Sequence, residues 1–320
     1  MSLPSLGIDI AKATFHACLL RDEKLRHKVF TNNEAGYNQL LAWLSHHKVS
    51  RAHACLEATA SYGDDLSHFL YNAGHLVSIV NPARIKGFAQ AEMARNKTDK
   101  MDSTIIARFC QSHRPAEWTP PPTEIAHLQR LVRRVETLQS MRQQEQNRVE
   151  QARADQLLLR SLENVIAMLD REIENLRKLI RQHIDGNPSL RADRELLLTI
   201  PGIGETTVNW LLSEVQMKQY RSARQLAAHA GLTPRQKESG TSVRGRSRLS
   251  KNGNARLRKA LYMPALVAKR YNPVVKAFCE RLSKRGKRPM EIIGAAMRKL
   301  LHIAYGVLKS GKDFDPSLAS

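Results

Sequence analysis

SLGIDIAKATFHACLL, residues 5–20, places two β-rich runs side by side and decides how the N-terminal part of the chain folds. A third β-rich run follows, and two more alternate with amphipathic helical stretches. The expected strands are residues 6–10, 14–20, 25–30, 52–56 and 76–80. The expected helices are residues 34–46, 62–73 and 99–112. Three successive strands followed by alternating helix and strand predict an α/β domain with a mixed sheet.

The positive charge of the chain is confined to one region. The 320 residues carry a net charge of +21. Residues 221–312 contain 23 lysines and arginines against three acids, whereas the rest of the chain is almost neutral, with 28 basic against 27 acidic residues. Charge of one sign at this density repels itself unless it meets a polyanion, so we expect this region to bind nucleic acid.

Composition limits the remaining classes. A length of 320 residues with 42% hydrophobic residues suits about two domains that each bury a core. No apolar run approaches the roughly 18 residues that span a bilayer, and the four cysteines form no CxxC pair. We therefore expect no membrane partner, no zinc site, and a protein of the reducing cytoplasm.

A proline linker and a long helical segment occupy the middle of the chain. WTPPPT, residues 118–123, contains three consecutive prolines and marks a boundary. Residues 124–183 lack proline and glycine, and their apolar residues recur with heptad spacing. The recurring positions are Leu162, Val165, Leu169, Ile173, Leu176 and Ile180. This spacing favours a coiled coil that forms a dimer, and an intramolecular helical hairpin remains open.

The basic region is preceded by LLLTIPGIGETTVNWLLSEV, residues 196–215, in which PGIG joins two apolar helical stretches. This pattern resembles a helix-hairpin-helix, whose turn offers backbone N–H groups to phosphate. We expect Gly202 and Gly204 to contact nucleic acid there. An ordinary packing corner between two helices is the alternative.

Four acids are the candidate catalytic residues of the N-terminal domain. Asp9 lies within the apolar strand GIDI, where a carboxylate is costly without a partner or metal. Glu57 ends the strand of residues 52–56, and Asp99 and Asp102 share one face at the start of a helix. Such a set suits a hard divalent cation. Taken singly, Asp99 could instead cap its helix and Asp102 could be a first-turn acid that offsets the helix dipole. Glu57 could accept backbone hydrogen bonds at the end of its strand.

Several long motifs occur in a characteristic order. They are GIDIAK, CLEATASYG, VNPARIKGFAQAEMARNKTDKMDSTIIARFC, IPGIG, AGLTPRQKESGTSVRGRSRLSKNGNARLRKALYMPA and AYGVLKSGKDFD. Together they resemble the one-ten family of bacterial insertion-sequence transposases, which are relatives of the Piv-type DNA invertases. The resemblance covers nearly the whole chain.

This resemblance implies a RuvC-like, ribonuclease H-like domain at residues 1–117. Its metal-binding and catalytic acids would be Asp9, Glu57, Asp99 and Asp102, holding Mg²⁺ or Mn²⁺. A helical coiled-coil segment at residues 118–188 would follow. A mainly helical, basic transposase domain with the helix-hairpin-helix would occupy residues 189–320.

The resemblance also implies a nucleophilic serine in the ESG segment, here Ser239, with Ser242 as the neighbouring candidate. Four cations follow that could hold and neutralise a phosphate: Arg244, Arg246, Arg248 and Lys251. The implied reaction passes through a 5′-phosphoserine link on donor and target DNA. A structured bridge RNA and a homo-oligomer, dimer or tetramer, are the implied partners.

Three alternatives remain open. A RuvC-like junction nuclease would use the four acids without a serine. A Piv-type site-specific invertase would recombine DNA without an RNA guide. An architectural or RNA-binding protein would explain the basic region but would not explain why a carboxylate, Asp9, lies within an apolar strand.

Overall fold

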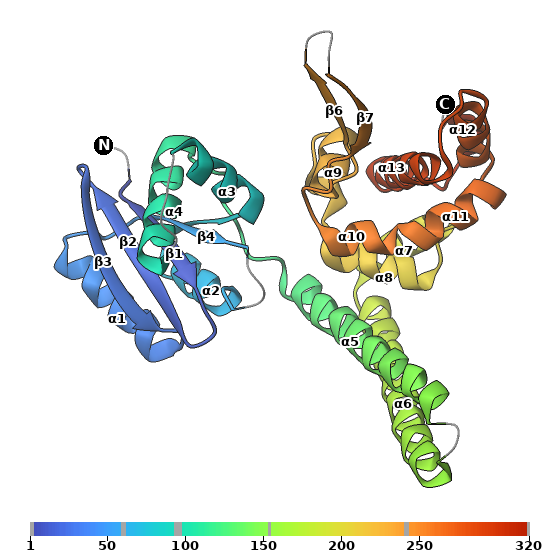
Figure 1. Ribbon diagram of the computed structural model, residues 1–320, viewed down its shortest axis with the longest axis horizontal. Helices are drawn as coiled ribbons and strands as arrows, with labels where there is room; N and C mark the ends of the chain where they lie inside the picture. Colours follow the sequence, from blue (N-terminus) through green and yellow to red (C-terminus); the bar gives the residue numbers. More distant parts are fainter. Residues whose placement is uncertain (1–2, 59–61, 93–97, 153–154, 240–242, 319–320) are drawn as a thin grey trace. The chain divides into compact units, whose positions relative to one another are not determined.

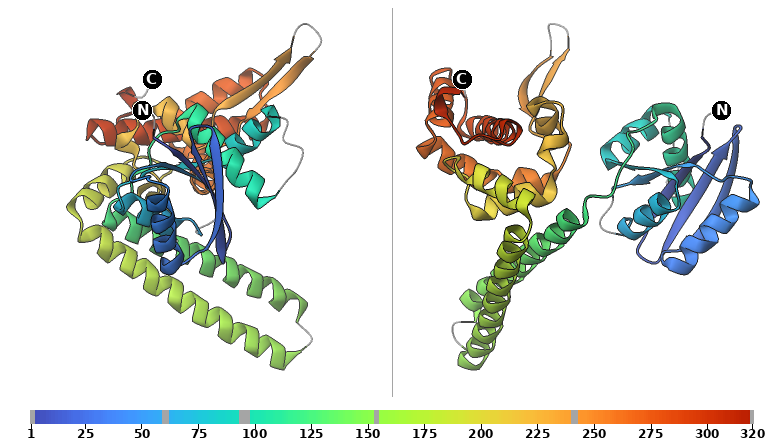
Figure 2. Two further views of the ribbon diagram at one scale, coloured as in Figure 1. Left: turned by 90° about the vertical axis from the view of Figure 1, so that its left-hand side faces the viewer. Right: turned by 180° about the vertical axis from the view of Figure 1, so that it is seen from behind.

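The computed structural model describes residues 3–58, 62–92, 98–152, 155–239 and 243–318, with only the backbone described for residues 236–239, 243–247 and 318. The chain divides into two compact units, residues 1–121 and 122–320. Figures 1 and 2 show the elements of each unit. None of the described helices combines the length and apolarity that a membrane span needs.

The first unit is built on a five-stranded sheet of order β3-β2-β1-β4-β5. Its elements are β1 (Ser5–Ile10), β2 (Thr14–Arg21), β3 (Lys24–Thr31), α1 (Glu34–His46), β4 (His53–Glu57), α2 (Asp64–Asn72), β5 (Leu76–Val80), α3 (Pro82–Ala91) and α4 (Asp99–His113). β1, β2 and β3 pair antiparallel, whereas β1, β4 and β5 pair parallel. The expected mixed sheet is therefore confirmed. Helix α3 was not expected from the sequence, although Asn81 caps it and Pro82 begins it.

The two faces of this sheet follow from strict alternation along β1. Leu6 and Ile8 are fully buried in a core that is completed by leucines of α1 and α2. Gly7 and Asp9 point to the opposite face, which α4 covers. Apolar packing therefore occupies one face completely, and the candidate acids are confined to the other.

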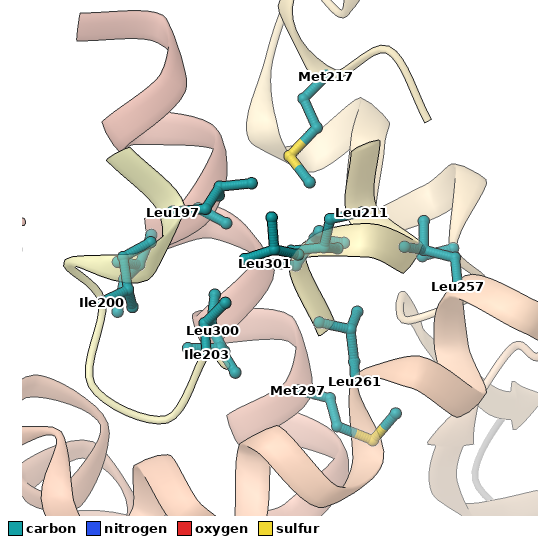
Figure 3. Packing of buried hydrophobic residues seen from close by; sticks show 14 of the residues in the cluster. Leu197, Ile200, Ile203, Leu211, Met217, Leu257, Leu261, Met297, Leu300 and Leu301 are labelled. Carbon is teal, nitrogen blue, oxygen red and sulfur yellow. The ribbon is translucent and has the colours of Figure 1, made fainter. Parts of the chain in front are cut away.

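The second unit is mostly helical. Its elements are α5 (Thr123–Gln151), α6 (Gln156–Asp185), α7 (Pro188–Leu198), α8 (Glu205–Glu214), η1 (Met217–Gln219), α9 (Ala223–His229), β6 (Pro234–Ser239), β7 (Val243–Leu249), α10 (Ala255–Ala260), α11 (Tyr262–Tyr271), α12 (Pro273–Lys284), α13 (Pro289–Ser310) and η2 (Pro316–Leu318). One large hydrophobic cluster joins the helices from α7 to α13, and its centre is shown in Figure 3. The antiparallel hairpin β6–β7 projects from these helices (Figure 2).

The long helical segment forms an intramolecular hairpin of α5 and α6, which is the arrangement that the heptad spacing left open. Asp155 ends the break between the two helices, because its carboxylate accepts hydrogen bonds from the N–H groups of Leu157 and Leu158. Leu169 and Ile173 are buried against α5, whereas Val165 is 37% exposed. The base of the hairpin shares the core of α7 to α13. The expected division into three segments, residues 1–117, 118–188 and 189–320, stays a prediction.

Candidate catalytic and nucleic-acid sites

The register of the sheet brings two of the candidate acids together. β1 and β4 are parallel, and Ile8 pairs with Leu56. Asp9 and Glu57 are the next residues on each strand, so they leave the paired segment side by side on the same face. Both carboxylates are half-buried and both interact with neighbouring groups. The acid that looked out of place in an apolar strand therefore has a second acid beside it.

Helix α4 brings the other two acids to the same end of the sheet. Its backbone packs directly on Gly7, where a Cβ would lie 2.2 Å from the Ser103 carbonyl oxygen and the Ala107 nitrogen. Gly7 therefore has to lack a side chain for α4 to approach β1. The first turn of α4, which carries Asp99 and Asp102, then follows the strand toward Asp9.

A contact across β2 confirms the position of this first turn. His16 pairs with Asp9 across β1 and β2. The Nε2 atom of His16 lies 3.3 Å from the Oδ2 atom of Asp99, whose side chain is 68% exposed. Asp102 is half-buried one turn of α4 further along. The four acids thus gather from β1, β4 and α4.

The chemistry of this set fits a hard cation, because it offers only carboxylate oxygens. Their spacing is more open than an occupied site requires. Within the described ranges, no three side chains of His, Cys, Asp or Glu lie close enough together to hold a metal ion. An adjoining pocket of about 530 Å³ is lined by Thr98 and Lys100 but not by the four acids. The backbone elements bring the four acids to one end of the sheet, and their role as a metal site stays a prediction.

The segment that carries the candidate serine forms the β6–β7 hairpin. Ser239 is the last residue of β6 and pairs with Val243, and Glu238 pairs with Arg244. Ser242 lies outside the described residues, and so do the side chains of Ser239, Arg244 and Arg246. Arg248 and Lys251 are exposed. Because the sequence predicted a mainly helical domain and no strands here, this hairpin is a difference from expectation.

The base of the hairpin is held by two glycine turns. Gly231 and Gly253 have φ of +67° and +145°, and a Cβ on Gly253 would lie 2.1 Å from the His229 carbonyl oxygen. Three backbone hydrogen bonds cross between the turns, from the N–H groups of residues 250, 251 and 254 to the carbonyl groups of residues 233, 231 and 229. These hydrogen bonds therefore tie the start of β6 to the end of β7.

Comparison with known proteins gives the family. Residues 6–153 match the DEDD transposase model of IS110 elements, and residues 194–280 match the transposase model of the IS116/IS110/IS902 family. The pilin gene-inverting proteins of Moraxella bovis and Moraxella lacunata are each 36% identical over 320 residues, covering 98% of both chains. An IS110 insertion-element protein of Streptomyces coelicolor is 28% identical over 38% of this chain and 30% of its own length.

The chain belongs to the IS110 transposase family. Membership makes it a DNA recombinase of the transposase type, as the resemblance implied. The DEDD domain implies a ribonuclease H-like fold for the first unit and, in general, the use of a divalent metal.

In this IS110-family chain, the two glycines of the PGIG turn have different environments. Gly202 has a φ of +103°, and a Cβ there would lie within 2.9 Å of the backbone of Ala268 on α11. Gly204 has no atom within 4 Å of its Cβ position and caps α8. Gly202 is thus explained by packing inside the unit, whereas Gly204 leaves an open approach to the backbone. Contact of either glycine with nucleic acid stays a prediction.

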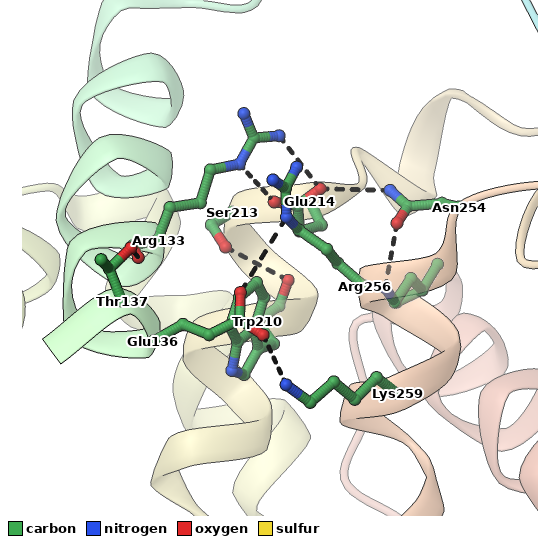
Figure 4. A network of polar contacts seen from close by, with 10 residues as sticks. Arg133, Glu136, Thr137, Trp210, Ser213, Glu214, Asn254, Arg256 and Lys259 are labelled. Carbon is green, nitrogen blue, oxygen red and sulfur yellow. Dashed lines mark hydrogen bonds and ion pairs between the residues drawn. The ribbon is translucent and has the colours of Figure 1, made fainter. Parts of the chain in front are cut away.

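A polar network that the sequence did not predict surrounds the buried carboxylate of Glu214 (Figure 4). The carboxylate of Glu214 is only 2% exposed and accepts two hydrogen bonds from Arg133 of α5, at 2.8 and 3.2 Å. The amide nitrogen of Asn254 donates to the same carboxylate at 3.1 Å, and the Asn254 Oδ1 atom caps α10. The signal in the sequence was an acid at the end of the apolar stretch TTVNWLLSEV. The network joins the α5–α6 hairpin to the turn that holds β6–β7.

Proposed function

We propose that this transposase cleaves and rejoins DNA with two sets of residues: the acids Asp9, Glu57, Asp99 and Asp102, and the serine Ser239. The observation that carries the proposal is the parallel register that sets Asp9 beside Glu57, with the first turn of α4 above them. An architectural protein has no need of a carboxylate pair at the end of a buried sheet.

The four acids would hold Mg²⁺ or Mn²⁺. When bound, such an ion neutralises charge on a phosphodiester and activates the oxygen atoms that attack and leave. His16 would keep Asp99 oriented at the start of α4, because their side chains are already in contact. The open spacing of the acids means that binding the ion has to draw the carboxylates together.

Ser239 would supply the nucleophile. Its hydroxyl oxygen would attack the phosphorus atom, the bond from phosphorus to the 3′ oxygen would break, and the proton of the hydroxyl would pass to the departing strand. This step leaves a 5′-phosphoserine and a free 3′-OH. Rejoining reverses the step with a 3′-OH from the other DNA, so no outside energy source is needed. Arg244, Arg246, Arg248 and Lys251 would stabilise the phosphate charge, and Gly202 and Gly204 would help to hold the backbone.

The partners in this proposal are donor and target DNA, a structured bridge RNA, and further copies of the chain. The exposed apolar side chains of α6, among them Leu157, Leu158 and Met168, support association of two α5–α6 hairpins. A dimer or a tetramer would then assemble on the DNA.

A Piv-type invertase without an RNA guide is the second candidate. The full-length resemblance to two pilin gene-inverting proteins favours it. Nucleic acid that co-purifies with the full chain separates the two functions. A single structured RNA that is required for DNA cleavage supports the guided transposase, and cleavage by RNA-free protein supports the invertase.

The test of the serine is a covalent-adduct assay. The full chain, Ser239→Ala and Asp9→Asn are incubated with radiolabelled DNA that carries the ends of the element and with Mg²⁺, and protein bound to label is resolved after denaturation. We expect an adduct only with the unaltered chain. An adduct formed by Ser239→Ala would move the nucleophile to Ser242, and free DNA ends without an adduct would indicate a nuclease.

A further inference from the structure

Helix α13 carries a continuous contact face along the second unit. Residues 294, 298, 302, 305 and 309 are spaced 4, 4, 3 and 4 apart and lie on one side of the helix. At one end, the Nζ atom of Lys309 donates to the Lys218 carbonyl group, and the Tyr305 hydroxyl donates to the Tyr220 carbonyl group at 2.9 Å. At the other end, a Cβ on Gly294 would lie 2.9 Å from the Cδ1 atom of Leu249, the last residue of β7.

Positively charged groups occupy the middle of this face. The segment from Lys218 to Tyr220 runs antiparallel to α13 and leads into α9, which packs on α13. Arg224 of α9 therefore lies near Arg298 and His302 of α13, between the Tyr305 contact and the end of β7. Neither Arg224 nor Arg298 forms an ion pair with an acid among the residues that the structure describes.

The surroundings of His302 show that the positive charges of this group are not neutralised by acids among the described residues. Burial lowers the pKa of its imidazole, and the charges of Arg298, Lys299 and Arg224 lower it further. Among the residues that the structure describes, the charges that shift this pKa are all positive. The Nε2 atom of His302 is buried and lacks a hydrogen-bond partner among the described residues. Like charges gathered around an unsatisfied imidazole cost free energy in the folded protein unless an anion joins them.

We infer that Arg224, Arg298 and His302 form a phosphate site for the DNA backbone, next to the base of the β6–β7 hairpin. The inference rests on the proposed function and adds to it a site that positions DNA. Two guanidinium groups can hold the non-bridging oxygens of one phosphate, and the imidazole can donate to the same group. Leu249 and Gly294 fix the distance between this site and the hairpin that carries Ser239.

The neighbouring hairpin supports DNA as the ligand. Arg235 and Arg248 pair directly across β6 and β7, and both are exposed. Two like charges at paired positions destabilise a hairpin that has no anion beside it. They add positive charge to the hairpin just beyond the contact of Leu249 with Gly294, so a DNA strand held at Arg298 would meet further cations on the element that carries Ser239.

The test measures binding of the full chain to a random-sequence DNA duplex of about 40 base pairs at several salt concentrations, because backbone contacts do not depend on sequence. We expect Arg224→Gln and Arg298→Gln each to weaken binding about 5- to 10-fold near 0.1 M salt and to reduce the salt slope by about 1. Arg298→Lys keeps the charge and should retain most of the affinity. Arg285→Gln removes an exposed charge just after α12 and should change binding less than about twofold.

Thermal unfolding of the same variants separates a binding role from a structural one. Removing a charge from a repulsive cluster should leave Tm unchanged or raise it, so weaker binding together with an unchanged or higher Tm supports the site. Equal salt slopes for Arg224→Gln, Arg298→Gln and Arg285→Gln, with intact DNA binding by the unaltered chain, would overturn the site and leave the proposed function standing. Losses seen only with an RNA of the same sequence would assign the cluster to RNA and overturn the assignment to DNA. An unaltered chain that binds no DNA would overturn both.

Discussion

The two candidate sites are built on opposite physical principles. Residues 1–121 carry 14 basic and 11 acidic residues, and their site is a set of carboxylates ordered by the register of a sheet. Residues 221–312 carry 23 basic residues and three acids, and their site is a hairpin held by glycine turns and surrounded by cations. Residues 122–220, with 14 residues of each sign, are neutral. The comparison teaches that the four candidate acids and the excess of positive charge lie in different units, so that a metal bound by one set and a polyanion bound by the other would not compete for the same charges.

The largest expected effect tests the acid site. Asp9→Asn keeps the size of the side chain but removes the charge beside Glu57, so we expect DNA cleavage to fall by at least about 10³-fold. DNA binding should stay unchanged, because the excess of positive charge lies in residues 221–312. Gel assays of cleavage and binding on the same preparations measure both quantities, and excess EDTA should reproduce the loss of cleavage.

The control for this change is Asp22→Asn, which removes an acid from the exposed turn between β2 and β3. It should cleave DNA normally. If Asp9→Asn retained full cleavage, the acids would have no catalytic part and the comparison between the two sites would fail.

The second prediction concerns what holds the basic site in place. Glu214→Gln leaves Arg133 without its buried carboxylate, and we expect the free energy of unfolding to fall by about 3 kcal/mol. Because Asn254 contacts the same carboxylate, the turn at the base of β6–β7 should loosen as well. Denaturant unfolding measures the first effect, and hydrogen exchange at the N–H groups of residues 250–254 measures the second.

Glu174→Gln is the matched control, since Glu174 forms ion pairs with Arg177 and Arg181 on the half-exposed surface of α6. We expect a loss of about 0.5 kcal/mol or less there. Equal losses for the two variants would show that the Glu214 network does not anchor the second unit.

The sequence predicted the elements that carry the four acids better than the hairpin that carries Ser239, and the reason is physical. Alternation along β1 and the ends of β1 and β4 are local patterns, so the positions of Asp9 and Glu57 could be predicted before the structure was known. Basic residues alternate along β7, but the strands β6 and β7 lack the alternating apolar residues that mark a half-buried strand. Their base is held by the turns at Gly231 and Gly253. Those turns are set by contacts between distant segments, which periodicity does not reveal.

The sequence left a helical hairpin open but did not predict where α5 ends and α6 begins, for a related reason. Residues 150–156 contain no glycine or proline, so no strong local breaker marks the turn. The loss of helical hydrogen bonds there is offset by packing of α6 against α5. The partners of Glu214 were likewise hidden, because Arg133 is 81 residues away in the sequence.

The smallest expected effects come from the two glycines of the PGIG turn, and they test whether this turn belongs to the packing or to the DNA site. Gly202→Ala places a Cβ against the backbone of Ala268 at a φ that side chains rarely adopt, so we expect a loss of about 2 to 3 kcal/mol in the free energy of unfolding. Gly204→Ala meets no atom within 4 Å and should cost only about 0.5 kcal/mol, from its position as the cap of α8. If the open backbone at Gly204 receives a phosphate, the new methyl group should nevertheless weaken DNA binding measured at constant salt, because it stands where the phosphate would approach. Normal DNA affinity in a stably folded Gly204→Ala would assign the turn to packing alone, and the positive surface that begins at Arg224 would then account for DNA binding without it.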